Sequence, residues 1–85
     1  MVLARSDVRW VQNQLFNRLC SIYVRTRDIS FIRGEDLKRE LAIPDHLFAE
    51  ALGAFRVGDQ LTVEVIDSGG ESYLRLGQRG RDNCE

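Results

Sequence analysis

The sequence is poor in several residue types, and each shortage excludes a class of protein. Among 85 residues there are one proline and one histidine, and no window approaches the run of about 18 apolar residues that a membrane span requires. His46 has no ligand cluster around it, whereas a zinc site needs three or four converging ligands. No nucleophile is accompanied by a base and an orienting group. We therefore expect no membrane contact, no metal or other cofactor, no small-molecule substrate and no enzymatic activity.

Cysteine is scarce as well, with Cys20 inside a helical pattern and Cys84 next to the last residue. Two cysteines so placed do not make the framework of a disulfide-stabilised secreted domain. The sequence therefore predicts one half-buried thiol and one thiol in the tail. Arg5 and Asp7 stand where a secretory signal would need an uninterrupted apolar stretch, so we predict a cytoplasmic protein.

An excess of one charge is also lacking, because 12 Lys and Arg stand against 13 Asp and Glu, for a net charge of −1. A strongly basic domain, the simplest sign of nucleic-acid binding, is therefore absent. The charges are unevenly placed, however. Residues 1–33 hold six arginines and two aspartates (+4), residues 34–74 hold three basic and nine acidic residues (−6), and residues 75–85 hold three arginines and two acids (+1). Such asymmetry steers partners by the sign of their charge.

A long amphipathic helix is predicted from Asp7 to about Arg27. Apolar residues recur on one of its faces at helical spacing: Val8, Val11, Leu15, Leu19 and Ile22. Trp10 points nearly opposite the centre of this face, and Val24 lies close to Trp10 around the helix. A large ring exposed to water indicates a partner, so these two residues form a first candidate contact patch.

The next segments predict a short extended stretch at 28–32, a helix at 35–41 and a third helix that starts near Pro44 or Asp45. The inner face of the third helix is apolar: Phe48, Ala51, Leu52 and Phe55. Two runs of alternating residues follow, around Val63 and at 73–76. Gly69-Gly70 lies between them and predicts a β-hairpin, whose first inward-pointing residues are Leu61, Val63 and Val65.

The segment from Leu37 to Phe55 contains an apolar pair, a tight turn ending in Ile43, and then an apolar residue followed by Ala-Leu and a further apolar residue. The apolar positions are Leu37, Leu41, Ile43, Phe48, Ala51, Leu52 and Phe55. With the hairpin behind it, this segment resembles the winged helix-turn-helix superfamily over about residues 28–77. The resemblance implies an α+β fold of three helices and a C-terminal β-hairpin wing in a single domain at 1–78, followed by a flexible tail at 79–85.

The recognition helix that the resemblance implies departs from the DNA-binding pattern, in which outward positions carry donors and positive charge. Here the outward positions are Asp45, His46, Leu47, Ala49, Glu50, Gly53 and Ala54. None is basic, and the wing tip adds Asp67 and Glu71. Small and apolar side chains instead let another protein approach closely, and their burial is favourable. A second candidate contact patch is therefore formed by Leu47, Ala49, Gly53 and Ala54.

The leading hypothesis is a small, non-enzymatic interaction module that works by protein–protein contact, either self-association or docking to a larger partner. The alternative is a DNA-binding regulator in an unusual pose, because many winged helices bind DNA. Its phosphate contacts would come from basic residues outside the acidic helix: Arg5, Arg9, Arg33, Lys38, Arg39, Arg75, Arg79 and Arg81. Salt separates the two hypotheses, since phosphate-driven affinity falls steeply as salt rises.

Overall fold

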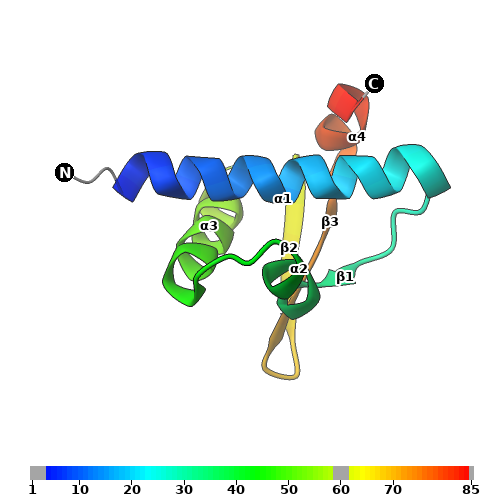
Figure 1. Cartoon of the computed structure of the whole chain (residues 1–85). Coiled ribbons are helices and arrows are strands. Elements are labelled where there is room, and N and C mark those ends of the chain that lie inside the picture. The colour runs from blue at the N-terminus through cyan, green and yellow to red at the C-terminus, as the bar shows by residue number, and fades with distance from the viewer. Residues whose placement is uncertain (1–3, 59–61, 85) are drawn as a thin grey trace.

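The computed structural model describes residues 4–58 and 62–84 of the chain, with side chains from residue 8 onwards. These residues form an α+β fold with one antiparallel sheet, in the strand order β1-β3-β2 (Figure 1). The elements are α1 (Ala4–Thr26), β1 (Ile32–Arg33), α2 (Gly34–Glu40), α3 (Asp45–Val57), β2 (Val63–Ser68), β3 (Glu71–Leu76) and α4 (Gln78–Cys84). The predicted α+β class is confirmed, and the arrangement is compatible with a winged helix.

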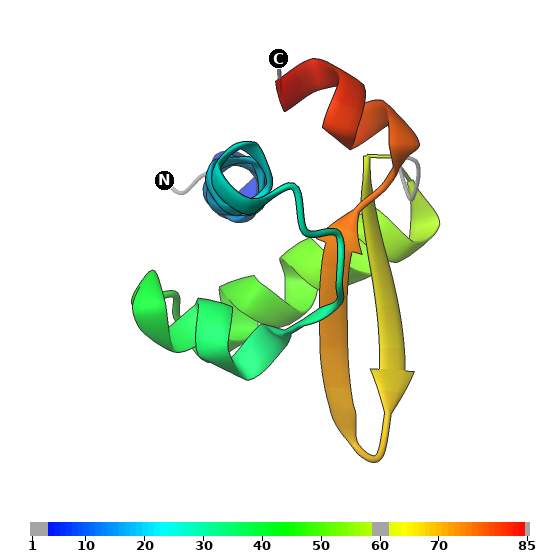
Figure 2. The same ribbon diagram turned by 90° about the vertical axis from the view of Figure 1, so that its right-hand side faces the viewer.

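Helix α1 lies between the other helices: α4 is on one side of it, and α2 and α3 are on the other (Figure 2). Its residues Val11, Leu15 and Leu19 follow one another at i, i+4 and are all buried. They complete a core drawn from α2, the turn after it, α3 and the sheet: Leu37, Ile43, Ala51, Leu52, Phe55, Val63, Val65, Leu74 and Leu76. The apolar periodicity of the sequence thus identifies the face of α1 that organises the core.

A tight turn joins α2 to α3. Ala42 has a left-handed backbone (φ 55°), its N–H donates to the carbonyl of Arg39, and the N–H of Ile43 donates to the carbonyl of Lys38 at 3.0 Å. This pattern satisfies the last carbonyls of α2 and directs Ile43 into the core. Pro44 then sets the extended backbone from which α3 starts.

Strand β1 is shorter than the predicted extended stretch at 28–32. The N–H of Asp28 donates to Thr26 Oγ1 at 3.1 Å, and the N–H of Ser30 donates to Asp28 Oδ1 at 2.9 Å. These local bonds form a turn after α1, so only Ile32 and Arg33 pair with β3. The bond from Ser30 also holds the pKa of the Asp28 carboxyl below its usual value.

The predicted hairpin is present, with Ser68 opposite Glu71 and Val63 opposite Leu76. Gly69 and Gly70 make the turn with φ 60° and 80°, which glycine adopts without steric cost. Val63 and Val65 point into the core as predicted. Leu61, the third residue of that predicted set, lies outside the described residues.

The prediction of a loose tail at 79–85 is wrong for the residues that the structure describes, because Gln78–Cys84 form helix α4. Gly80 is buried, and a Cβ at this position would clash with the carbonyl oxygen of Thr62. The N–H of Gly77 donates to that same oxygen at 2.9 Å. The absence of a side chain at Gly80 thus lets α4 dock directly on the backbone before β2, a contact that hydrophobic periodicity does not indicate.

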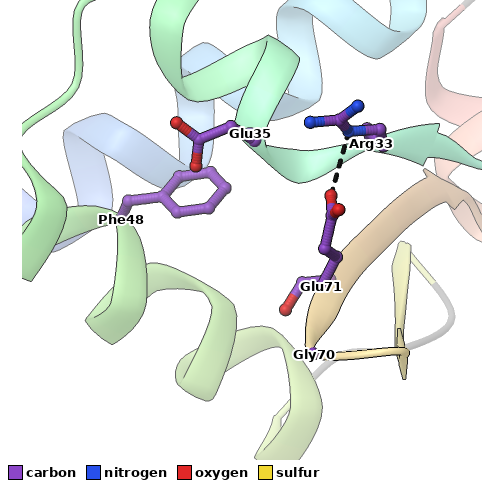
Figure 3. Close-up of a pocket in the computed structure, with 6 residues that line it drawn as sticks. Arg33, Glu35, Phe48, Gly70 and Glu71 are labelled. Carbon is purple, nitrogen blue, oxygen red and sulfur yellow. Dashed lines mark ion pairs between the residues drawn. The ribbon is translucent and has the colours of Figure 1, made fainter.

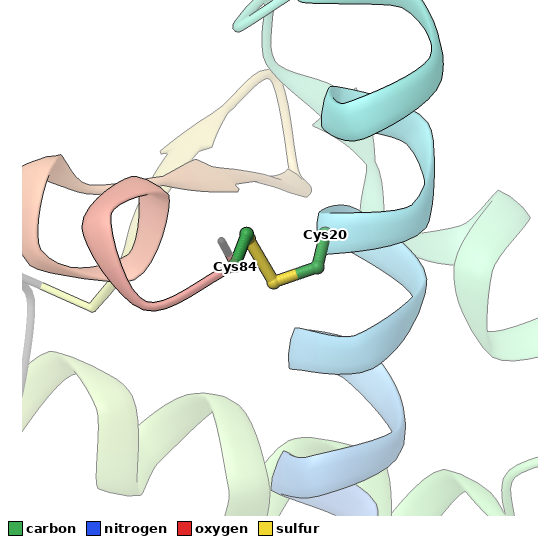
Figure 4. The surroundings of a disulfide bond; sticks show 2 residues. All are labelled: Cys20 and Cys84. Atoms are coloured by element: carbon green, nitrogen blue, oxygen red, sulfur yellow. A yellow bond between two sulfur atoms is a disulfide. The ribbon is translucent and has the colours of Figure 1, made fainter.

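The prediction of two separate thiols is also wrong. Cys20 on α1 and Cys84 at the end of α4 form a disulfide, with 5.4 Å between their Cα atoms (Figure 4). The bond joins residues 64 positions apart and fixes α4 against α1. The spacing of the cysteines along the chain gave no sign of this proximity, which the three-dimensional path of the chain creates.

Candidate interaction surface

The first predicted contact patch lies on α1. Trp10 is 52% exposed and Val24 is 49% exposed, so both side chains face solvent as predicted. Fourteen positions of helix separate them along the chain, which corresponds to about 21 Å at 1.5 Å per residue. The structure therefore places them at two separate points of the helix, and Trp10 is the larger candidate anchor.

The second predicted patch lies on α3 and is only partly exposed. Leu47 is half-buried against the core, so its predicted exposure is wrong. Leu47 precedes the buried residues Ala51 and Phe55 by one and two helical turns, and i, i+4 spacing puts all three on one face. Ala49 is exposed, whereas Gly53 and Ala54 are half-buried. A Cβ added at Gly53 would meet no atom within 4 Å, so this stretch of α3 borders open space.

Three further large apolar side chains of the described residues face solvent without having been predicted as contacts. Ile29 after α1 is 41% exposed, Val57 at the end of α3 is 90% exposed, and Ile66 on β2 is 43% exposed. The alternation of the hairpin residues already placed Ile66 on the face opposite Val63 and Val65. That signal could have identified Ile66 as a surface residue.

The predicted phosphate-contacting residues near the helix–turn–helix segment are paired with carboxylates. Arg33 contacts Glu71 on the wing at 2.9 Å. Lys38 contacts Asp45 at 2.5 Å and Glu35 at 3.3 Å, and only 19% of its side chain is exposed. Glu35 also lies 3.7 Å from Arg39, which is largely exposed. The basic residues of this region thus neutralise acids of the same surface.

Arg75 on the sheet is paired in the same manner. Its Nε donates to Glu64 at 2.5 Å, and its guanidinium lies over the ring of Phe31, 4.5 Å from the ring centre. Both contacts hold the cation against the sheet, where Arg–aromatic stacking is favourable. Arg75 is therefore part of the packing of the outer sheet face.

The other predicted phosphate-contacting residues lie on α1 and α4. Arg9 and Arg79 are exposed, on different helices. Arg81 is half-buried and its Nη1 donates to the carbonyl of Leu76 at 3.4 Å. Arg5 belongs to α1, but its side chain lies outside the described part. The eight predicted residues are thus spread over the molecule, and no single basic surface brings them together in the described structure.

Two carboxylates of the surface have a lowered pKa. The hydrogen bond and the charge of Lys38 hold the pKa of Asp45 below its usual value, and the same hydrogen bond raises the pKa of Lys38. The pKa of Asp67 is lowered mainly by the hydroxyl of Ser72, which donates to Oδ1 at 2.7 Å, with a smaller contribution from Arg56. Both acids are therefore ionised at neutral pH, and the surface around α3 and the wing carries their negative charge.

Sequence reasoning did not anticipate a pocket between the wing and the helices. It has a volume of about 400 Å³ and is lined by Arg33, Glu35, Phe48, Gly70, Glu71 and Ser72. Figure 3 shows the Arg33–Glu71 ion pair beside the ring of Phe48. Phe48 packs this deeply because Gly34 has no side chain: a Cβ there would lie 3.0 Å from the ring. The pocket is rimmed by charges that already neutralise one another.

In the part of the chain that the structure describes, no three His, Cys, Asp or Glu side chains are grouped so as to hold a metal ion. No helix among the described residues combines the length and the apolar character needed to cross a membrane. Comparisons of the chain with protein-family models, curated proteins and solved structures found no match.

Proposed function

We propose that this chain is a winged-helix-type, non-enzymatic domain that acts by contact with another protein. The observation that carries the proposal is the pairing of the basic residues around α2 and the wing. Arg33, Lys38 and Arg39 each lie within 4 Å of a carboxylate. Duplex DNA carries about one negative charge per 1.7 Å of its axis, so binding would have to break these pairs or press their acids against phosphates.

The exposed side of α3 supports the same conclusion. Asp45 and Glu50 face solvent there, with the small residue Ala49 between them along the chain. The wing adds Asp67 and Glu71, which are also exposed. An acidic surface repels phosphates but accepts a protein partner, especially one with basic side chains.

Trp10 supplies the strongest candidate anchor for such a partner. Half of this large side chain faces water, and tryptophan is among the residues that contribute most to binding when a partner buries them. Burying apolar area contributes about 25 cal/mol per Å². Ala49 and the open space beside Gly53 offer a second, flatter point of contact on α3.

DNA binding is the alternative function, and Arg9 and Arg79 are the exposed cations on which it depends most. The disulfide bears on the predicted cytoplasmic location, because disulfides persist mainly in oxidising compartments. The prediction itself rested on Arg5 and Asp7 near the start of the chain, and the disulfide favours an oxidising compartment instead.

The test measures solution mass against protein concentration, and amide shifts against a mixed-sequence duplex at low and high salt. Trp10→Ala and Ala49→Arg each change one of the two contact points, and both positions are exposed, outside the buried core. Asn17→Ala, at another exposed position of α1, is the control. Self-association that Trp10→Ala or Ala49→Arg weakens and Asn17→Ala does not would support protein contact. Salt-sensitive shifts at Arg9 and Arg79 on adding the duplex would replace the proposal with DNA binding.

A further inference from the structure

The disulfide lies beside an open hollow on the surface of α1. The hollow has a volume of about 500 Å³ and is lined by Cys20, Ser21, Val24 and Arg25. Cys20 and Cys84 are both half-buried, but only Cys20 lines the hollow among the described residues. The hollow therefore brings a small molecule against Cys20 and not against Cys84.

The chemistry of the hollow suits an attacking thiolate. Thiol–disulfide exchange proceeds by attack of a thiolate on one sulfur, and positive charge nearby favours the thiolate form. Arg25 provides that charge at the rim, and Ser21 provides a hydroxyl. Val24, which the sequence predicted as part of a protein contact, also lines this hollow and gives it an apolar wall.

We propose that the disulfide is a thiol-exchange site, opened by attack of a low-molecular-weight thiol on Cys20 Sγ, and that its opening releases α4. In the first step the thiolate RS⁻ bonds to Cys20 Sγ, the bond between Cys20 and Cys84 breaks, and Cys84 leaves as a thiolate that takes up a proton. A second thiol then attacks the mixed disulfide, which leaves Cys20 reduced and the two small thiols oxidised to RSSR. This inference does not depend on the proposed protein contact.

Release of α4 follows from how little else holds it. The helix has seven residues, too few for a stable isolated helix, and its apolar side chain against the core is that of Cys84, which the disulfide itself holds there. Apart from the disulfide, the polar contacts at this end of the described chain include the bond from the N–H of Gly77 to the carbonyl of Thr62 at 2.9 Å and the bond from Nη1 of Arg81 to the carbonyl of Leu76 at 3.4 Å. The core stays intact, because its residues lie on α1, α2, α3, the turn between α2 and α3, and the sheet.

Opening would uncover the flank of α1 that faces α4. Between the two helices lies a second hollow of about 360 Å³, lined by Tyr23, Gln78, Arg81 and Asp82. Tyr23 is half-buried and packs against the core. Loss of α4 turns this hollow into an exposed surface around Tyr23 and Cys20.

The first experiment locates the attack. The oxidised protein is exposed briefly to reduced glutathione at neutral pH, quenched with acid, alkylated and digested with trypsin. Cleavage after Arg18, Arg25 and Arg81 places the two cysteines in separate peptides, 19–25 and 82–85. We expect glutathione on peptide 19–25 and the alkyl group on peptide 82–85. The reverse pattern, with glutathione on Cys84, would overturn the site of attack.

Two arginine variants test whether positive charge at the hollow speeds the exchange. Arg25→Gln removes the rim cation and should slow the exchange about two- to threefold, as expected for one partly screened charge. Arg9→Gln removes an exposed arginine at the other end of α1 and should leave the rate unchanged. Equal rates for both variants would show that the hollow does not guide the thiolate, and would count against the proposal.

A second experiment measures release. The opened protein is capped with iodoacetamide, freed of glutathione and treated with limiting trypsin. Cleavage after Arg79 and Arg81 should become faster by about tenfold or more, since a released segment exposes its backbone to the protease. Cleavage after Arg18, which is paired with Glu40 at 2.8 Å, should stay slow because the core is intact. Continued protection of Arg79 and Arg81 would show that α4 stays docked and would overturn the release.

A Cys84→Ser variant tests the same state without any reductant. Hydrogen exchange of its α4 amides should match that of the opened, capped protein and exceed that of the oxidised protein. Slow exchange in α4 of Cys84→Ser would contradict the proposal independently of the glutathione chemistry.

Discussion

Helices α2 and α4 have the same length, seven residues, but they are held in different ways. Helix α2 buries Leu37 in the core, and Lys38 ties it to α3 through Asp45. Helix α4 adds no side chain to that buried core and is fixed by a disulfide and by the close approach of Gly80 to a backbone oxygen. Neither helix is stable alone, so the surroundings determine each one. Helix α2 is thus held by hydrophobic packing, whereas α4 is held mainly by a covalent bond.

The largest expected effect comes from removing the disulfide. Closing a loop of 64 positions restricts the unfolded chain and stabilises the fold by about 4 kcal/mol in the chain-entropy description. The double variant Cys20→Ser, Cys84→Ser should lose up to this amount of its free energy of unfolding. The loss is smaller than the full amount where the released α4 gains conformational entropy in the folded protein. Urea unfolding of the variant against the oxidised protein measures the difference. A loss below about 1 kcal/mol would mean that the bond adds little to the fold.

The corresponding change for α2 is Leu37→Ala. Leu37 is 1% exposed, so the substitution leaves a cavity in the core and should cost about 3 kcal/mol. Arg39→Ala on the same helix is the control, because Arg39 is largely exposed and its ion pair is long. The control should change stability by less than about 0.5 kcal/mol. Leu37→Ala should loosen the packing of α2 and of the core together, whereas opening of the disulfide releases α4 and leaves the core packed.

These two helices also show how far the sequence could predict the fold. Helices α1, α2 and α3 and the hairpin were predicted because apolar residues recur at the period of each element and then pack together. Helix α4 has no such period. Its position depends on the missing side chain of Gly80 and on a cysteine pair that only the folded chain brings together.

The candidate site was predicted less completely than the fold. The exposure of Trp10 followed from its position opposite the apolar face of α1 and is confirmed. Leu47 was assigned to the outside of α3, although its spacing of four and eight from Ala51 and Phe55 indicates the buried face. The ion pairs of Arg33 and Lys38 could not be predicted, because Glu71 and Asp45 lie across turns whose geometry the sequence does not specify.

Each of the two helices contains a glycine that lies close to other atoms. A Cβ at Gly80 would clash with a backbone oxygen that cannot move alone, whereas at Gly34 it would lie 3.0 Å from the Phe48 ring and from the carbonyl oxygen of Ser72. Gly80→Ala should therefore push α4 away from the backbone of Thr62, while the disulfide keeps its end tied to α1, at a cost of about 2 kcal/mol, and Gly34→Ala should cost about 1 kcal/mol. Thermal unfolding and hydrogen exchange in α4 distinguish the two variants.

Gly53→Ala is the control for both glycine variants. Gly53 lies inside α3, and a Cβ there meets no atom within 4 Å. Alanine favours the helix over glycine by about 0.5–1 kcal/mol, so this variant should be more stable than the parent chain. If Gly80→Ala were equally stabilising, the close docking of α4 on Thr62 would be wrong.

The smallest expected effect is a dependence on pH that concerns α2 and not α4. The hydrogen bond from Lys38 lowers the pKa of Asp45, so the folded chain binds the Asp45 proton less tightly than the unfolded chain does. The stabilisation is therefore present above the ordinary carboxyl pKa of about 3.9 and is lost as the pH falls through the lowered value. In α4, the Arg81 side chain bonds to the Leu76 carbonyl, which does not titrate in this range.

Asp45→Asn should accordingly be slightly less stable than the parent chain at pH 7 and should approach it as the pH falls toward 2. Urea unfolding of both proteins across this range measures the convergence.

Asp67→Asn is the comparison variant, because the pKa of Asp67 is lowered mainly by Ser72 on the neighbouring strand, away from α2. Protection of the α2 amides against hydrogen exchange should fall in acid before protection of the α4 amides does, as long as the disulfide is intact. The reverse order would mean that the ion pair with Asp45 does not hold α2, and that Leu37 alone fixes this helix.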